Sequence, residues 1–425
     1  MSVSPPSRRS LLAALGPGLV FAGAAVGVSH LVQSTRAGAS YGLSLVAFVV
    51  FANIVKYPAF RFGAHYAAAS GVSLLEGYRR QGRFALVLYL ILTLATMWTV
   101  QAAVTVVTAG LLIHITGVSL SPLITSGLLL VFCGALLGVG QYKWLDRVTK
   151  VAVAIFTVAT LMATLMALPK LSAVSFWPDF DAWSLPDVLF VAALIGWMPS
   201  AIDVSVWQSL WTLAKAKERG VLSYRDTMLD FHVGYGGTVM LALCFVILGA
   251  SVLSGQELEG QAGAFGAQLV QLYADTLGEW SRPLIATAAL LVMFSTTLTV
   301  LDGFPRALSV LFERFREPET PFDERTSAPK SRRGPYWVAM LALAGGSLGV
   351  LAFALSSLKA MVDLATTLSF LTAPILSLLN HRAMTQTPFS GEGQPSPLLL
   401  RASLAGLAIQ GAFALCYLWL KVIAS

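Results

Sequence analysis

The chain alternates between long apolar stretches and short polar connections from one end to the other. A helix of about 20 apolar residues is long enough to cross a hydrocarbon core about 30 Å thick. No amphipathic helices that would cover such stretches in a soluble protein are visible. The pattern therefore predicts an all-α polytopic membrane protein with about eleven transmembrane helices, at 11–33, 43–65, 84–113, 122–140, 149–168, 185–211, 232–253, 281–308, 336–357, 359–380 and 398–422.

Composition narrows the class of protein. Charged residues make up 12% of the 425 residues, and the mean hydropathy is +0.74. Soluble domains carry about 25% charged residues. Hydrolases with a serine nucleophile use a Gly-x-Ser-x-Gly motif, zinc proteases use His-Glu-x-x-His, and ATP-driven pumps use a phosphate loop. The sequence holds none of these motifs. We therefore expect no enzyme, no cofactor beyond a coupling ion, the lipid bilayer as partner, and no obligatory protein partner.

The basic residues indicate topology. The net charge is +7, but the Lys and Arg residues are not clustered as a nucleic-acid surface requires. They gather in alternate loops and at the N-terminus, where Arg8 and Arg9 lie. The positive-inside rule then places the N-terminus in the cytoplasm and, after eleven spans, the C-terminus outside. We expect an integral protein of a bacterial inner membrane, with the polar segment at 312–335 as a cytoplasmic linker.

Two apolar helices are interrupted five spans apart. The first contains Gly27-Val28-Ser29-His30, and the sixth contains Gly196-Trp197-Met198-Pro199-Ser200. Proline removes a helical hydrogen bond, and Gly/Ser pairs are also sites of kinks. Backbone freed inside a bilayer lines a cavity or is satisfied by protein, and paired breaks are typical of inverted-repeat transporters with a midplane site. The alternative is that both breaks are simple kinks.

The paired breaks predict a single transporter domain over 1–425. It comprises a first repeat at about 11–168, a second repeat at about 185–380 and an extra helix at about 398–422. An ion-coupled secondary transporter is the function that this organisation favours.

Several segments resemble the Nramp (natural resistance-associated macrophage protein) family of divalent-metal transporters. The strongest match lies in the first helix, and weaker matches follow in order along the chain. They are Leu15-Gly16-Pro17-Gly18, the run from Gln33 to Ala39 with Gly42, the stretch from Gly71 to Arg79, Met198-Pro199, and Ser295-Thr296-Thr297. The resemblance implies a LeuT-type fold of two inverted five-helix repeats plus one helix, with helices 1 and 6 interrupted.

The departures from that family fall on its metal ligands. The family breaks helix 1 at Asp-Pro-Gly-Asn, whose Asp and Asn bind the metal, whereas an ungapped register here places Gly27, Val28, Ser29 and His30 there. The His that follows Met-Pro in the family's helix 6 is replaced by Ser200. The helix 1 carboxylate is therefore missing, and the resemblance implies a rearranged site.

The two breaks supply the candidate substrate site. Asp203 is the acid nearest to the second break, and an intramembrane carboxylate is usually functional. If the substrate is a metal ion, Met198 and Asp203 are its expected ligands. Two plainer interpretations remain open: that Asp203 pairs with Lys56, and that His30 is a hydrogen-bonded packing residue. The full candidate set is Gly27, Ser29, His30, Met198, Ser200 and Asp203.

A coupling ion has two candidate positions. In LeuT-type transporters, hydroxyls of helix 8 and carbonyls at the helix 1 break can hold Na⁺, which makes Ser295, Thr296 and Thr299 candidates. Asp203, or His30, is the candidate for H⁺, because the predicted helix at 84–113 has no acidic residue. The alternative is that these hydroxyls bond to their own helix carbonyls.

Three functions follow as hypotheses. The first, and the one that we expect, is transport of a divalent metal ion through the rearranged site, which the family resemblance and Met198 favour. The second is transport of another small solute, such as the anion bicarbonate, driven by Na⁺, because half-helix N-termini after Ser29 and Pro199 favour negative charge. The third is a membrane sensor, which no soluble signalling domain supports.

Overall fold

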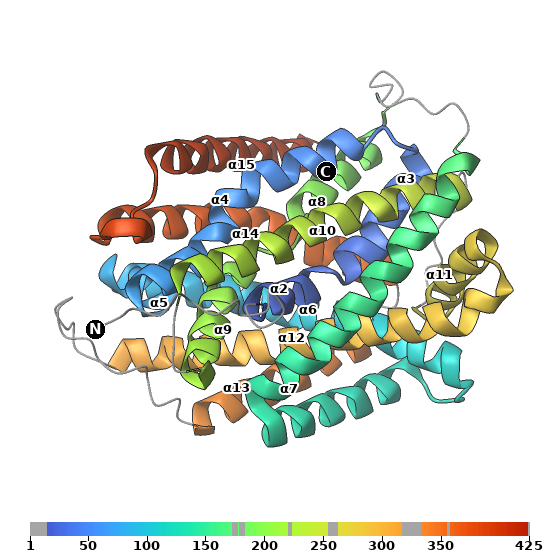
Figure 1. Ribbon diagram of the computed structural model, residues 1–425, viewed down its shortest axis with the longest axis horizontal. Helices are drawn as coiled ribbons and strands as arrows, with labels where there is room; N and C mark the ends of the chain where they lie inside the picture. Colours follow the sequence, from blue (N-terminus) through green and yellow to red (C-terminus); the bar gives the residue numbers. More distant parts are fainter. Residues whose placement is uncertain are drawn as a thin grey trace, which may run out of the picture.

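The computed structural model describes residues 15–171, 177, 183–219, 223–253, 262–316, 333–354 and 358–423. Within these ranges every regular element is a helix. Most of the long helices run along the long axis of the molecule, and the short helices lie among them and at the ends (Figure 1). The all-α architecture expected from the apolar stretches is confirmed.

The helices follow the apolar stretches in chain order. The first half of the molecule contains α2 (Pro17–Ala25), η1 (Ser29–Ser34), α3 (Thr35–Tyr41), α4 (Val46–Ser70), α5 (Leu74–Arg80), α6 (Arg83–Thr116), α7 (Pro122–Ala167) and η2 (Leu168–Lys170). The second half contains α8 (Leu185–Trp197), α9 (Asp203–Arg219), α10 (Tyr224–Val252), α11 (Ala262–Leu277), η4 (Glu279–Ser281), α12 (Arg282–Arg316), α13 (Arg333–Gly349), η5 (Val350–Ala354), α14 (Leu358–Gln386), η6 (Gly391–Gly393) and α15 (Pro397–Ile423).

The structure does not confirm the expected eleven membrane spans. Among the described residues, 9 helices are long and apolar enough to cross a membrane, and 10 if the bent pair in helix 1 counts as one span. The expected span at 185–211 is divided into α8 and α9, and α8 has only 13 residues. Eleven spans are therefore not confirmed, because each half of a broken helix is too short to cross the bilayer alone.

Both expected breaks are present. α2 ends at Ala25, a π-helix begins at Ser29, and the two parts of helix 1 meet at an angle of 50°. α8 ends at Trp197, and α9 begins at Asp203. The first helix continues to Tyr41, eight residues beyond the expected 33, because a glycine with φ of 61° at Gly42 ends it.

α10 forms the surface against which both halves of helix 1 pack. A Cβ on Gly18 would lie 2.0 Å from the Asp230 carbonyl oxygen, and one on Gly38 would lie 2.0 Å from the Val246 carbonyl oxygen. On α10, a Cβ on Gly249 would meet the Thr35 carbonyl oxygen at 2.2 Å. These helices approach backbone to backbone, as small residues permit in membrane proteins.

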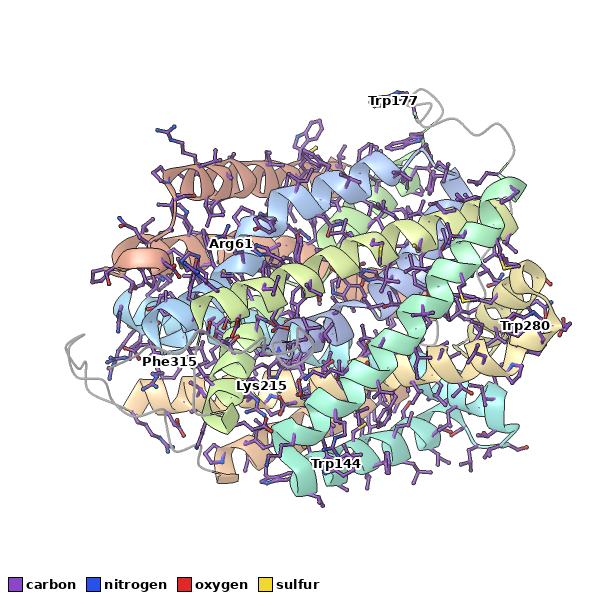
Figure 2. The ribbon with its side chains drawn as sticks, viewed as in Figure 1. Arg61, Trp144, Trp177, Lys215, Trp280 and Phe315 are labelled. Atoms are coloured by element: carbon purple, nitrogen blue, oxygen red, sulfur yellow. The ribbon has the colours of Figure 1, made fainter. Side chains whose placement is uncertain are left out.

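Aromatic side chains lie near both ends of α12. Figure 2 shows Trp280, just before α12, and Phe315, near its C-terminal end, at opposite ends of the molecule. Trp280 is 63% exposed, and Phe315 is partly buried. The segment Glu279–Arg316 between them is long and apolar enough to cross a membrane.

Candidate functional site

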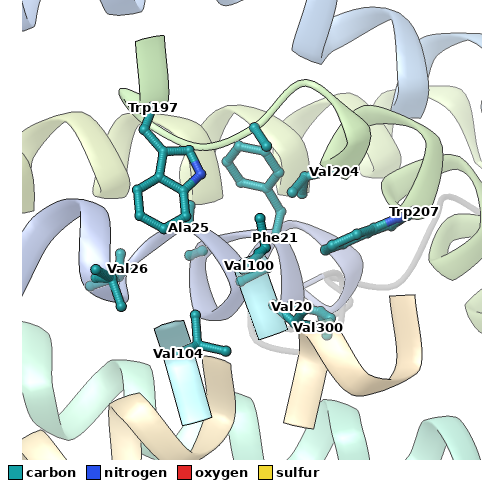
Figure 3. Packing of buried hydrophobic residues seen from close by; sticks show 14 of the residues in the cluster. Val20, Phe21, Ala25, Val26, Val100, Val104, Trp197, Val204, Trp207 and Val300 are labelled. Atoms are coloured by element: carbon teal, nitrogen blue, oxygen red, sulfur yellow. The ribbon is translucent and has the colours of Figure 1, made fainter. Parts of the chain in front are cut away.

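A small cavity lies between the helix 1 break and the helix 6 break. Its walls come from α2, α6, α8, α9 and α12, together with both unwound segments. Ser29, Ser200 and Thr296 contribute hydroxyl groups, and the other lining side chains are apolar or aromatic. Figure 3 shows Trp197 and Trp207 on either side of Val100 and Ala25 in this region. The cavity therefore offers hydroxyls and backbone groups but no charged side chain among its lining residues.

Ser29 joins the two breaks. Its Oγ lies 2.7 Å from the Ala25 carbonyl oxygen, 3.2 Å from the Pro199 carbonyl oxygen and 2.8 Å from Nδ1 of His30. The hydroxyl has a single proton to donate, so it cannot serve all three neighbours at once when His30 Nδ1 is unprotonated. The single Ser29 proton is therefore directed to one of these three protein acceptors at a time.

His30 lies beside the cavity and not on its wall. It is completely buried, and its Nε2–H donates to the Thr238 carbonyl oxygen of α10 at 2.9 Å. With Nδ1 against Ser29, both ring nitrogens have protein neighbours. The geometry corresponds to the packing interpretation, in which His30 orients Ser29.

Neither Gly27 nor Met198 is among the residues that line the cavity. A Cβ on Gly27 would lie 2.6 Å from Cγ2 of Thr296, so Thr296 occupies the space that a larger residue at position 27 needs. Met198 is completely buried in an apolar cluster with Val49, Phe190 and their neighbours. Met198 therefore packs among hydrocarbon side chains and does not line the cavity.

From the sequence we named Lys56 only as an ion-pair partner for Asp203, and the structure contradicts that ion pair. The ammonium group, 1% exposed, donates to the carbonyl oxygens of Ile195 at 2.7 Å and Gly196 at 2.5 Å. These carbonyls form the C-terminal end of α8, where the helix dipole is negative. A protein cation therefore occupies the position at which that helix end would attract a cationic ligand.

Asp203 lies at the first turn of α9 but is not among the residues that line the cavity. It is 1% exposed, and neither carboxylate oxygen has a hydrogen-bond partner within the described part of the chain. The carboxylate is therefore buried outside the lining of the substrate cavity.

The candidate hydroxyls of α12 separate into two groups. Oγ1 of Thr296 lies 2.7 Å from the Gly23 carbonyl oxygen and 3.3 Å from that of Val26. Oγ of Ser295 lies 2.8 Å from the Val292 carbonyl oxygen and 3.5 Å from the place of a Cβ on Gly23. These oxygens converge at the end of α2. Thr299 instead donates to the Thr296 carbonyl of its own helix at 2.9 Å.

The arrangement offers little to a divalent cation. Across the described ranges, no group of three or more His, Cys, Asp or Glu side chains is placed to hold a metal ion. Hard divalent cations in proteins are bound mainly through carboxylate oxygens.

The sequence analysis did not assign three residues to the site. They are Lys56, Trp197 and Trp207. The position of Lys56 inside an apolar stretch could have indicated a role in the site, because charged residues are rare inside membranes.

Two solved structures of transporters share the fold of this protein. The structure superimposes on a manganese transporter of Eremococcus coleocola with a TM-score of 0.70, covering 98% of this chain and 88% of that chain at 14% identity. It also matches MhsT in complex with L-phenylalanine, with a TM-score of 0.64, covering 97% of this chain and 100% of that chain at 15% identity. These likenesses confirm the LeuT-type fold and, at such identities, show the fold alone.

Sequence comparisons establish the family. An uncharacterised protein of Pasteurella multocida (strain Pm70) is 35% identical over 419 residues, which cover 96% of this chain and 92% of that protein. The family model described as natural resistance-associated macrophage protein-like matches residues 18–419. Members of this family are membrane transporters and not enzymes. The chain therefore belongs to the Nramp family and is an integral membrane transporter.

Proposed function

We propose that this protein is a secondary transporter of a small anion of bicarbonate size, driven by Na⁺. The observation that carries the proposal is the chemistry of the central cavity, whose polar side chains are the hydroxyls of Ser29, Ser200 and Thr296. A divalent cation would have to shed its water there without a carboxylate to replace it. An anion needs hydrogen-bond donors, which the Ser200 hydroxyl and the backbone N–H groups at the starts of the two half-helices would supply.

Two further features favour negative charge in the substrate. The helical segments that begin at Ser29 and Asp203 direct the positive ends of their dipoles toward the breaks. Backbone N–H groups in the first turn of a helix have no intrahelical acceptor. At the other half of helix 6, Lys56 neutralises the carbonyls of α8. The local field therefore favours an anion over a cation.

The coupling ion is proposed to bind next to the cavity, between α2 and α12. Its ligands would be the carbonyl oxygens of Gly23, Val26 and Val292 with the hydroxyls of Ser295 and Thr296. Unwound carbonyls at helix breaks hold Na⁺ in transporters of this architecture. Because Thr296 belongs to both the cavity and this group of oxygens, Na⁺ binding would order one wall of the substrate site.

A divalent metal ion is the second candidate substrate. Membership in the Nramp family and the structural likeness to a manganese transporter favour it. Met198 and Asp203, the expected ligands, lie in different surroundings, the first in an apolar cluster and the second buried without a hydrogen-bond partner in the described ranges. A metal substrate would require these two side chains to turn into the cavity together.

One substitution separates the two candidates. Ser200→Asp places a carboxylate on the cavity wall, and Ser200→Asn is its uncharged control of the same size. An anion about 4 Å from the new carboxylate would be repelled by about 4 kcal/mol at an effective dielectric constant of about 20, a loss of affinity on the order of a thousandfold. A metal ion would gain a ligand instead.

The experiment measures Na⁺-driven bicarbonate uptake and Mn²⁺ uptake into liposomes containing each purified variant. The proposal predicts that Ser200→Asp abolishes bicarbonate uptake while Ser200→Asn retains most of it. Mn²⁺ uptake by the unmodified protein that increases in Ser200→Asp would contradict the proposal and support the metal candidate.

A further inference from the structure

Arg61 is a charged residue on an exposed, largely apolar face of α4. Phe51 and Ile54 of the same helix are exposed. Arg61 is partly exposed and follows Ile54 by seven positions, about two helical turns, so it lies on the same side of the helix. A charged side chain within a membrane-spanning segment is costly and usually has a partner. The surroundings of Arg61 therefore require an explanation.

Arg61 has no carboxylate partner among the described residues. Its Nη1 lies 3.4 Å from the Tyr57 hydroxyl of the same helix, and its Nε is buried without an acceptor. Arg306, which also lies inside an expected span, pairs with Asp302 instead. A guanidinium group has five N–H donors. Most of those of Arg61 are therefore left for an acceptor from outside the chain.

His232 on α10 brings a second donor to the same place, where Figure 2 labels Arg61. The Tyr57 hydroxyl lies 2.7 Å from Nε2 of His232, and the two rings stack with centroids 6.0 Å apart. Because the Tyr57 oxygen accepts from Arg61, its proton goes to Nε2, which leaves the N–H of the imidazole on Nδ1. His232 is exposed. Arg61 and His232 therefore lie on either side of one tyrosine hydroxyl, each with a donor left over.

Both residues lie at one edge of the apolar zone of the helices. The expected spans end at residue 65 in α4 and begin at residue 232 in α10. Arg61 is thus about one turn inside the end of the first span, and His232 is the first residue of the second. The headgroup region of a bilayer begins where the hydrocarbon core ends, and arginine side chains extend toward it from within the core. Lipid phosphate groups are therefore within reach of this pair.

We propose that Arg61 and His232, joined by Tyr57, bind the phosphate group of an anionic phospholipid between α4 and α10. The phosphodiester supplies the acceptor oxygens that both donors lack, and a guanidinium group binds phosphate through two parallel hydrogen bonds. Basic pockets between transmembrane helices are a usual site for anionic lipid headgroups. The acyl chains would lie along exposed apolar side chains farther into the spans, such as Ile54 and Met240.

The apolar surroundings favour a lipid over a dissolved phosphate ion. Leu229 and Val233, on either side of His232 in α10, are exposed apolar residues. A phosphate ion would gain the two donors and nothing from these side chains, whereas a lipid also buries hydrocarbon against the exposed helix faces. The lipid site is separate from the substrate cavity, because neither Arg61 nor His232 lines it. It does not depend on the proposed substrate.

Native mass spectrometry of the full-length protein in detergent measures the binding of single lipid molecules. The probes are phosphatidylglycerol and phosphatidylcholine with the same acyl chains, and the choline group of the second places a positive charge near Arg61. We expect the first phosphatidylglycerol to bind more tightly than the first phosphatidylcholine. Arg61→Gln should weaken its binding by about fivefold or more, the effect of one basic residue beside anionic lipid. Arg401→Gln, which removes an exposed charge near the start of α15, is the matched control and should bind as the unmodified protein does.

Two further variants keep the test informative if Arg61→Gln does not fold. Arg61→Lys retains the charge without the paired N–H groups and should bind phosphatidylglycerol with intermediate affinity, and His232→Phe retains the ring without its donor and should also bind it more weakly. Unchanged melting temperatures without added lipid identify the folded variants.

Three results would overturn the lipid site. The first is equal affinity of the unmodified protein and the folded Arg61 and His232 variants for phosphatidylglycerol. The second is an equal loss of affinity in Arg61→Gln and Arg401→Gln, which would indicate a general effect of charge. The third is displacement of the bound lipid by millimolar inorganic phosphate, which would assign the two donors to a dissolved anion.

Discussion

The carboxylate of Asp230 on α10 accepts a hydrogen bond from the backbone N–H of Gly18 at 2.6 Å. Its other oxygen accepts from the N–H of Gly16 at 2.7 Å. N–H groups at the start of a helix have no intrahelical acceptor, and an acidic side chain there also complements the helix dipole. The N-terminal half of helix 1 is thus attached to α10 at its first turn.

Replacing Asp230 tests the energetic contribution of this attachment. Asp230→Asn substitutes an NH₂ group for one acceptor oxygen, which leaves a donor facing a donor. We expect a loss of stability of about 1–3 kcal/mol, the cost of an unsatisfied buried group. Thermal unfolding in detergent measures it, with Asp226→Asn one turn away as control. Equal melting temperatures for the two variants would contradict the attachment.

The close contact between α10 and helix 1 gives a second prediction. A Cβ on Gly249 would lie 2.2 Å from the Thr35 carbonyl oxygen, whereas one on Gly236 of the same helix would meet nothing within 4 Å. Gly249→Ala should therefore prevent the helices from packing and abolish recovery of monodisperse protein. Gly236→Ala should be recovered like the unmodified protein. Normal recovery of both would contradict the backbone contact.

Much of the fold was predictable from the sequence because bilayer thickness fixes the length of apolar helices. The breaks at Val26–Val28 and Met198–Ile202 were also predictable, since glycine and proline weaken helices locally. The number of spans was not, because a helix broken near its middle consists of two segments that are each too short to span the membrane.

The site was less predictable, because spacing along a helix does not say which face meets which neighbour. Asp203 and Met198 are five positions apart, yet neither lines the cavity, and the second packs in an apolar cluster. Thr296 and Thr299 are adjacent candidates by sequence, yet only Thr296 has a hydrogen bond to α2. The direction of Lys56 depends on where α8 ends, which no local pattern gives.

The difference between the two threonines predicts how Na⁺ dependence will change. Thr296→Val keeps the shape of the side chain but removes the oxygen that faces Gly23 and Val26. We expect the Na⁺ concentration for half-maximal uptake to rise at least about tenfold, which corresponds to about 1.4 kcal/mol. Thr299→Val, whose hydroxyl bonds within α12, should behave as the unmodified protein. An equal effect of both substitutions would contradict the proposed ion site.

A pair of charges joins α3 to α14. Arg36 lies 3.0 Å from Asp363, and its guanidinium group lies 4.4 Å from the centre of the Phe190 ring of α8. If helix 1 separates from α14 during transport, linking these positions should stop it. In a cysteine-free background, Arg36→Cys with Asp363→Cys should lose uptake on oxidation and regain it on reduction. Full uptake by the oxidised protein would show that this contact does not open.

The central claim is that a cavity without a carboxylate selects an anion over a divalent cation. Uptake of bicarbonate and of Mn²⁺ into the same preparation of liposomes, with and without an inward Na⁺ gradient, tests it most directly. We predict bicarbonate accumulation that requires the Na⁺ gradient, and no Mn²⁺ uptake above that of empty liposomes. Mn²⁺ accumulation by the unmodified protein without bicarbonate transport would contradict the claim.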